Sequence, residues 1–356
     1  MLMPLSCAES SRGPSCPRPP GARNRNARRR APPSLPPRAC AGAGRARGGA
    51  RPFALASRTA DRGIVPAVSP AQKLRDLLAS PGLLVMPCCF DALSARLIEQ
   101  AGFSLSFMSG FAVSAARLGA PDTGLISYGE MVDQARAICG AVSIPVLGDG
   151  DTGYGNAMNV KRTVRGYAQA GLACVMIEDQ VAPKRCGHTR GKQVVPRDEA
   201  FTRVQAAVDA RDEGAGVLIM ARTDARQTHG FDEALARARA FADLGADIVF
   251  LEAPESVEEM RTFCREVRVP TMANMVDHGR TPVLPPAELG AIGYKIAAYP
   301  LTLLSVAAAA MREALAALRA GRHPDPRTSF AALQEIVGFP EYYAEEARYA
   351  QPPGKG

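Results

Sequence analysis

The sequence of 356 residues lacks several features that would assign it to a common class of protein. It contains no tryptophan and no apolar run of 18 residues, so we expect no membrane-spanning helix. It has nine cysteines, but six of them lie scattered beyond the leader, mostly within apolar runs. This distribution is unlike a disulfide framework or a zinc site, and it is typical of a reducing compartment.

Acidic residues are almost absent from the first 60 residues, which contain twelve arginines, no lysine and one acid, Glu9. This leader carries a charge of +11, so the remaining 296 residues are mildly acidic at −3, which argues against nucleic-acid binding. Its Arg-, Pro-, Ala- and Ser-rich composition is typical of an organelle transit peptide. We expect a disordered transit peptide over residues 1–62 for the chloroplast or, alternatively, the mitochondrion. A basic tail that binds an acidic partner is the other interpretation.

Eight short apolar runs follow the leader, and segments of helical periodicity alternate with them. The runs are Leu83–Met86, Leu105–Met108, Pro145–Leu147, Cys174–Ile177, Val217–Met220, Ile248–Leu251, Thr271–Ala273 and Lys295–Ala298. Parallel strands that are buried on both faces require such runs. We therefore expect an α/β fold, a (β/α)8 TIM barrel over residues 63–356. An open doubly wound sheet is the alternative, but no GxGxxG motif follows the first run.

Three further helices are expected outside the repeated units. A short helix over residues 70–80 precedes the first strand. From about residue 301, two more helices are expected at Leu303–Leu318 and Ala331–Tyr349, and they are longer than closure of a barrel needs. The Ala-rich run followed by EYYAEEARYA indicates packing or subunit contacts.

Polar residues stand at the ends of the expected strands, where a barrel of this type has its catalytic face. They are Asp91, Ser109, Gly110, Asp149, Asp151, Glu178, Arg222, Asp224, Glu252, Asn274 and Tyr299. Asp149 and Asp151 are like charges on a buried strand end, and they repel unless a cation lies between them. We expect this pair to hold Mg²⁺, with Mn²⁺ as the alternative ion. Asp91 could instead cap a helix, and Asp224 could pair with Arg222.

A loop from Pro183 to Gln193 follows the fourth strand and carries the run KRCGH. Its cationic residues surround Cys186, so the thiolate form of that cysteine should be favoured. Gly187 and Gly191 would let the loop move as a lid. A metal, a proton donor and several cations together suggest chemistry on a small polycarboxylate.

These motifs resemble those of the isocitrate lyase/phosphoenolpyruvate mutase superfamily over about residues 67–350. In family order they are SGF at 109–111, PDTG at 121–124, DGDTGYGN at 149–156, IEDQ at 177–180, KRCGH at 184–188, ARTDA at 221–225 and ANM at 273–275. The runs GHTRGKQVV and EYYAEEARYA resemble the plant petal-death-protein branch, 2-alkylmalate lyases that also hydrolyse oxaloacetate.

The resemblance implies a role for each matching residue. The metal ligands would be Asp149 and Asp151, with Asp122 and Glu178 ordering the waters of the metal. The 2-oxo-acid carboxylate would be bound by Ser109, Gly110 and Phe111 with help from Arg222. Cys186 would be the general acid, and the second carboxylate would be bound by Lys184, Arg185 and His188 beside Gly187. Glu252 and Asn274 would complete the pocket. The family fold also implies exchange of the last helices between subunits, in a dimer of helix-swapped dimers.

Departures from the family patterns narrow the function that the resemblance implies. Isocitrate lyases have Trp and methylisocitrate lyases have Gly at the position of Phe111, and phosphonate-forming mutases have Asn at that of Cys186. The implied activity is Mg²⁺-dependent carbon–carbon cleavage of a 2-hydroxy (2-alkyl) dicarboxylate, such as a 2-alkylmalate or a 2-methylisocitrate-like acid, to a 2-oxo acid and a carboxylate. The alternatives are oxaloacetate hydrolysis to oxalate and acetate, a phosphonate-type mutase, and a non-catalytic dicarboxylate-binding barrel.

Overall fold

The computed structural model describes residues 68–187, 191–277, 279–325 and 328–350, all of which belong to one compact unit that begins at Ile64. The expected transit peptide lies outside the described residues, and so does His188 of the KRCGH run. Within these ranges, no helix combines the length and the apolar character that crossing a membrane requires.

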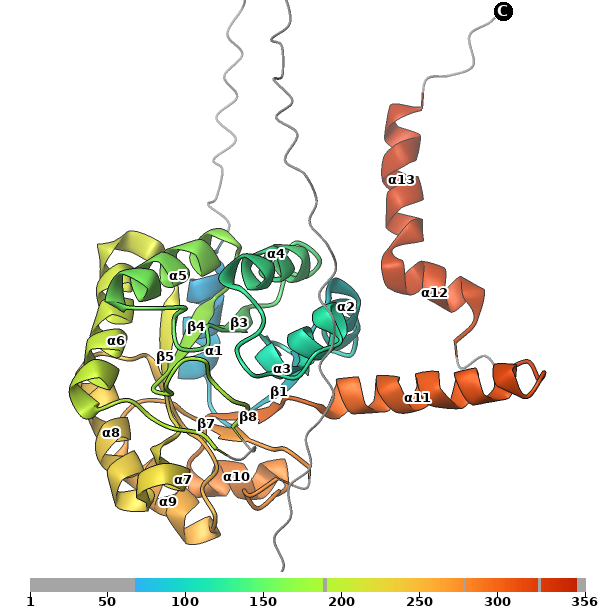
Figure 1. The fold of residues 1–356 in the computed structure, drawn as a ribbon. Helices are drawn as coiled ribbons and strands as arrows, with labels where there is room; N and C mark the ends of the chain where they lie inside the picture. The colour runs from blue at the N-terminus through green and yellow to red at the C-terminus, as the bar shows by residue number, and fades with distance from the viewer. Residues whose placement is uncertain (1–67, 188–190, 278, 326–327, 351–356) are drawn as a thin grey trace, which may run out of the picture. The chain divides into compact units, whose positions relative to one another are not determined.

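Eight parallel strands close into a barrel in which each strand pairs with the next and β8 pairs with β1 (Figure 1). The strands are β1 (Leu84–Cys89), β2 (Ser106–Met108), β3 (Val146–Asp149), β4 (Cys174–Glu178), β5 (Leu218–Thr223), β6 (Ile248–Leu251), β7 (Thr271–Asn274) and β8 (Ile296–Tyr299). All eight expected strands are present, and the predicted (β/α)8 barrel is confirmed. Several strands run on into the polar residue that follows the apolar run, as β3 does at Asp149.

The strands bury both of their faces in two separate apolar layers. One layer fills the inside of the barrel and includes Phe107, Leu147, Met176, Met220, Phe250, Met272 and Ala298. The other lies between the strands and the helices and includes Val175 and Ile177 of β4. Because side chains alternate along a strand, the residue two positions beyond an inward-facing one also faces inward. Several polar residues lie two positions beyond an inward-facing apolar residue, so the barrel positions them above its apolar interior. They include Asp149 after Leu147, Arg222 after Met220, Glu252 after Phe250 and Asn274 after Met272.

Helices surround the barrel, and several of them begin after a residue whose side chain caps the helix. They are α1 (Pro70–Ala79), α2 (Ala92–Gln100), α3 (Gly110–Val113), α4 (Tyr128–Cys139), α5 (Ala157–Gln169), α6 (Arg197–Ala210), α7 (Ala225–His229), α8 (Phe231–Asp243), α9 (Val257–Glu266) and α10 (Pro286–Ile292). Asp91 accepts a hydrogen bond from the Ser94 backbone at 2.7 Å, and the Ser94 hydroxyl accepts one from the Asp91 backbone at 3.1 Å. Asp91 is therefore the N-cap of α2, the structural role that the sequence left open.

The chain continues after β8 into α11 (Thr302–Arg319), α12 (Phe330–Val337) and α13 (Phe339–Tyr349) (Figure 1). The prediction of one helix over Ala331–Tyr349 is wrong, because the segment breaks at Gly338. This glycine has φ 87°, a left-handed conformation that ends helices, and Pro340 lies in the first turn of the next helix. The Ile336 carbonyl accepts a hydrogen bond from Gln100 at 3.2 Å, so α12 lies against α2.

Glu233 on α8 lies between two arginines, at 2.9 Å from Arg197 Nε and 2.8 Å from Arg237 Nε. These hydrogen bonds, that from Arg197 above all, lower the pKa of Glu233 to about 2. An acid with a depressed folded-state pKa stabilises the fold above its unfolded pKa, here about 4.3, and the contribution is lost as the pH falls through the folded value. We predict that Glu233→Gln lowers the free energy of unfolding at neutral pH, and that the deficit shrinks in acid.

Urea unfolding of the wild type and the variant across this pH range measures the effect. Asp243→Asn, an exposed change on the same helix, is the control and should show little deficit at any pH. A deficit of Glu233→Gln that stays constant down to about pH 3 would contradict the prediction.

Candidate active site

The carboxyl ends of the strands surround a cavity of about 220 Å³. Its lining includes most of the residues expected at the site, namely Ser109, Phe111, Asp122, Asp149, Lys184, Cys186, Gly187, Arg222, Glu252 and Asn274. The parallel barrel brings them together because all eight strands end on the same side. Gly110, Asp151 and Glu178 are absent from the described lining, but each contacts a residue that belongs to it.

Apolar residues that the sequence reasoning missed form the rest of the lining. Cys88, Phe107, Met176, Phe250, Met272 and Ala298 come from the barrel interior, and Val276, Pro300 and Leu301 follow β7 and β8. The interior set could have been found from strand alternation, because several of its members lie two positions before a polar strand end. The residues after β7 and β8 carry no such signal in the sequence.

Asp149 is held at the end of β3 by backbone groups. Its Oδ2 accepts a hydrogen bond from the Gly110 backbone at 3.2 Å, and its Oδ1 accepts one from the Asp151 backbone at 3.0 Å. A Cβ at position 110 would lie 2.5 Å from Asp149 Oδ2, so this approach requires glycine. The Gly110 N–H therefore binds a protein carboxylate here, whereas the resemblance implied that it would bind the substrate. Asp151 has φ 49°, a strained conformation for an aspartate.

Lys184 lies buried within a group of acids. Its Nζ is 2.7 Å from Asp122 Oδ1 and 2.9 Å from Asp151 Oδ1. Burial alone would lower the pKa of Lys184, but the neighbouring acids, led by Asp151, raise it well above its usual value. Burial also raises the pKa of Asp151 to about 7 and that of Glu178 well above its ordinary range. Both carboxyl groups therefore favour their neutral form unless a further cation joins the ammonium group beside them.

Several buried carboxylate oxygens in the described part of this group make no hydrogen bond. Within the described part of the chain, Asp122 Oδ1, Asp151 Oδ1 and both carboxylate oxygens of Glu178 are buried without a hydrogen bond, although three of the four oxygens lie in ion pairs. Buried acid oxygens that make no hydrogen bond can accept a further cation, and Glu178 Oε1 is not in one of these ion pairs either. No three His, Cys, Asp or Glu side chains of the described residues converge on one point. A cation that takes one or two carboxylates and completes its shell with waters and substrate oxygens does not need three such side chains.

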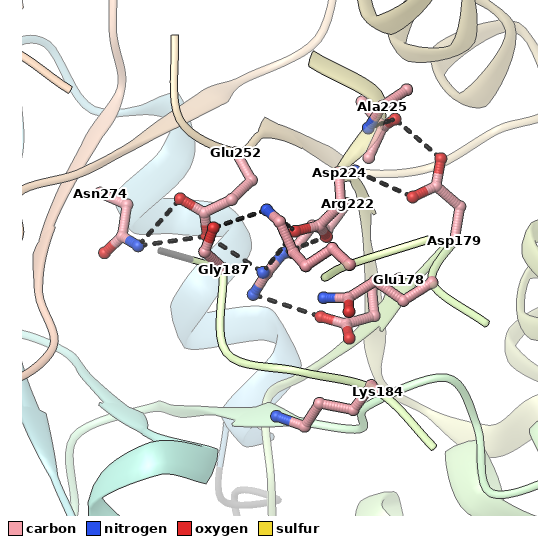
Figure 2. A network of polar contacts seen from close by, with 12 residues as sticks. Glu178, Asp179, Lys184, Gly187, Arg222, Asp224, Ala225, Glu252 and Asn274 are labelled. Atoms are coloured by element: carbon pink, nitrogen blue, oxygen red, sulfur yellow. Dashed lines mark hydrogen bonds and ion pairs between the residues drawn. The ribbon is translucent and has the colours of Figure 1, made fainter. Parts of the chain in front are cut away.

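Arg222 is buried beside three carboxylates that come from neighbouring strands (Figure 2). Its Nε and Nη2 donate to Asp224 at 2.8 and 2.9 Å, its Nη2 lies 3.1 Å from Glu252 Oε2, and its Nη1 lies 3.2 Å from Glu178 Oε2. Glu178 and Arg222 are direct partners in the β4–β5 ladder. The pairing of Arg222 with Asp224, which the sequence left open, is present. Asn274 donates to Glu252 Oε2 at 3.3 Å and extends the network to β7.

The loop that carries Cys186 is fixed at both of its described ends. The Gln180 side chain accepts from the Arg185 backbone N–H at 2.9 Å and donates to its carbonyl at 2.8 Å. The Cys186 N–H donates to the Asp122 carbonyl at 3.2 Å. Lys192, which the sequence reasoning did not assign, donates to the Gly187 carbonyl. These bonds place the half-buried Cys186 in the wall of the cavity.

The sequence is similar to those of known proteins. Residues 74–319 match the family described as phosphoenolpyruvate phosphomutase. The chain is 44% identical to 2,3-dimethylmalate lyase of Eubacterium barkeri, over 79% of this chain and 98% of that protein. It is 36% identical to the petal death protein of Dianthus caryophyllus, over 82% and 94% of the two chains.

Two solved structures share the fold. One is oxaloacetate acetylhydrolase in complex with 3,3-difluorooxalacetate, with a TM-score of 0.77 and 36% identity over 80% of this chain and 99% of that chain. The other is phosphonopyruvate hydrolase in complex with oxalate and Mg²⁺, with a TM-score of 0.71 and 30% identity over 80% and 100%.

Proposed function

Because the chain belongs to the phosphoenolpyruvate phosphomutase family and is a carbon–carbon lyase of the isocitrate lyase/phosphoenolpyruvate mutase superfamily, we propose that its substrate is a 2-alkylmalate. The observation that carries this choice is the division of the cavity into a charged part and an apolar part. Asp149, Arg222 and Glu252 come from β3, β5 and the end of β6. The apolar residues Phe111, Val276, Pro300 and Leu301 follow β2, β7 and β8.

A 2-alkylmalate matches this division, because it has two carboxylates and an apolar substituent beside the bond to be broken. Each buried methylene of that substituent contributes about 0.8 kcal/mol. Oxaloacetate carries no alkyl group and would leave the apolar part unfilled. Hydrolysis of oxaloacetate is the second candidate, and the similarity to oxaloacetate acetylhydrolase favours it.

Asp149 and Asp151 would hold the Mg²⁺ ion, or Mn²⁺, with Asp122 and Glu178 beside them. The buried carboxylate oxygens that make no hydrogen bond in the described structure support this assignment, as does a related structure that contains Mg²⁺. When bound, the cation would polarise the oxygen and the carboxylate at C2 of the substrate.

The chain's own groups supply the binding and the proton transfers. Arg222 and Ser109 hold the carboxylate next to C2, and Lys184 faces the acids at the charged end. One of the buried carboxylates beside Lys184 takes the proton of the C2 hydroxyl. Among these carboxylates, that of Asp122 lines the cavity. The C2–C3 bond then breaks, C2 becomes the carbonyl carbon of the 2-oxo acid, and the electron pair stays on C3.

Cys186 donates its thiol proton to C3, which completes the second carboxylate product. The net change is the transfer of one proton from the C2 oxygen to C3. Positioned acid–base groups of this kind typically give about 10²–10⁴-fold acceleration.

We predict that the purified protein with Mg²⁺ cleaves 2,3-dimethylmalate to pyruvate and propionate, measured as NADH oxidation in the presence of lactate dehydrogenase. EDTA should abolish turnover and added Mg²⁺ should restore it.

Cys186→Ser should lower kcat by about 10²-fold or more, because a hydroxyl is a far weaker acid than a thiol with a pKa of about 8.5. Release of oxalate from oxaloacetate without cleavage of any 2-alkylmalate would replace the proposal by its alternative.

We also propose that the protein is a homo-oligomer, a dimer of dimers in which the C-terminal helices pack on a second copy. Ala317 is the one buried residue of α11 in the described structure, whereas Val306, Met311, Leu315 and Leu318 are exposed. Exposed apolar surface of this extent marks an interaction site. The barrel also offers an apolar groove of about 330 Å³ between β1, α2 and the start of α11.

Light scattering after size-exclusion chromatography tests the assembly. We expect the wild type to have four times the mass of one chain, and Leu315→Glu to be smaller, because the charge would enter the apolar contact. Arg312→Gln on the same helix is the control and should leave the mass unchanged. A monomeric wild type at micromolar concentration contradicts the proposal.

We further propose that residues 1–62 direct the protein to the chloroplast, on the basis of the twelve arginines and the single acid among the first 60 residues. These residues fused to a fluorescent reporter should bring the reporter into plastids of a plant cell. A reporter without the segment is the control. Cytosolic fluorescence of the fusion would refute the proposal, and mitochondrial fluorescence would replace it by the alternative.

A further inference from the structure

Lys192 is a buried cation for which the proposed chemistry has no use. Its side chain is 1% exposed, and that of its partner Asp224 is fully buried. The ammonium group donates to Asp224 Oδ1 at 2.8 Å and to the Gly187 carbonyl at 2.5 Å. Lys192 is absent from the described lining of the cavity, so any effect on the reaction must pass through these two partners.

Asp224 joins Lys192 to the arginine of the site. Its Oδ1 accepts hydrogen bonds from both Lys192 and Arg222, and its Oδ2 accepts a second bond from Arg222. Burial alone would raise the pKa of Asp224, but Arg222 and Lys192 outweigh it and hold the pKa well below its usual range. Asp224 is therefore a charged link, and removal of Lys192 would leave it paired with Arg222 alone.

Gly187 lies directly against the same arginine (Figure 2). A Cβ at this position would lie 2.4 Å from Glu252 Oε2 and 2.6 Å from Arg222 Nη2, so the peptide fits only because the residue is glycine. Gly187 follows Cys186 in the chain, and the Cys186 N–H is bonded to the Asp122 carbonyl. The bond from Lys192 to the Gly187 carbonyl thus fixes the backbone of Cys186 on its second side.

We propose that Lys192 is a positioning residue, which holds Cys186 in the wall of the cavity by tying the Gly187 carbonyl to the Asp224–Arg222 pair. The proton donor and the carboxylate-binding arginine then share one buried ion network and keep a fixed relation to each other. The kinetic consequence rests on the proposed function, whereas the position of Cys186 does not depend on it.

Lys192→Met removes both hydrogen bonds and keeps an unbranched apolar side chain, whereas Lys192→Arg keeps the charge. Arg211→Met is the matched control. Arg211 likewise bonds a carboxylate and a carbonyl, Asp247 and Gly245 at 2.7 Å each, but it does so at the amino end of β6, away from the cavity. Gly187→Ala is a second disrupting variant, which displaces the same peptide without removing a buried charge.

The first readout is alkylation of Cys186 by iodoacetamide, followed by peptide mass spectrometry. We expect alkylation to be several-fold faster in Lys192→Met and in Gly187→Ala than in the wild type, with less protection by oxalate plus Mg²⁺. Lys192→Arg should recover part of the wild-type behaviour, and Arg211→Met should match the wild type. With 2,3-dimethylmalate as substrate, kcat of Lys192→Met should fall by about 10²-fold, because a displacement of the Cys186 thiol by about 1 Å has a cost of this size. KM should change less, because Arg222 remains in place.

Thermal melting separates a structural role from a positioning role. If Lys192→Met has a lower Tm but alkylates at the wild-type rate with full protection, the inference is overturned. If Lys192→Met does not fold, the alkylation rate of Gly187→Ala becomes the test. A Gly187→Ala variant that is alkylated at the wild-type rate also overturns the inference. Alkylation needs no turnover, so a wild type that cleaves no 2-alkylmalate would refute the proposed function and leave this test standing.

Discussion

The buried guanidinium group of Arg222 is the charge on which the arrangement of the site depends. A cation in a low-dielectric interior is costly unless carboxylates surround it with good geometry. Here Glu178, Asp224 and Glu252 do so from three adjacent strand ends, and the aligned β4–β5 ladder brings Glu178 opposite Arg222. The position of Arg222 therefore follows from the barrel itself, which makes it a rigid platform for the peptide of Gly187.

A second buried cation balances the other part of the site in a different way. Lys184 reaches Asp122 and Asp151 from the loop after β4, so its place depends on the position of that loop. Glu178 is buried between the two groups, beside Arg222 and within the electrostatic reach of Lys184. A divalent cation beside the acids around Lys184 would favour their ionised form. The fixed arginine and the loop-borne lysine thus divide the site into a permanent part and a part that depends on the loop.

The apolar interior of the barrel strengthens these charges. Phe107, Met176, Phe250 and Met272 lie in the cavity wall below the polar strand ends, and they keep the medium around the ion pairs poor in water. Electrostatic interactions gain strength in such surroundings, and an unpaired charge becomes more costly there. The same alternation along each strand that fills the barrel with apolar side chains also directs the polar residue two positions later into the cavity. Fold stability and reactivity therefore come from one pattern.

The sequence by itself determined the eight strands, because apolar runs and the periodicity of the helices between them are properties of neighbouring residues. It also predicted most of the cavity, since residues such as Asp149 and Asn274 directly follow those runs and parallel strands end on one side. A glycine with a proline two positions later signals the break at Gly338, but the apolar and helix-forming residues on both sides of it favour one continuous helix. The tertiary structure alone decided which charges pair, how Lys192 ties Gly187 to Asp224, and that Val276 and Leu301 close an apolar part of the cavity. These contacts join residues far apart in the chain, so they exist only once the barrel closes and fixes the distances between its strand ends.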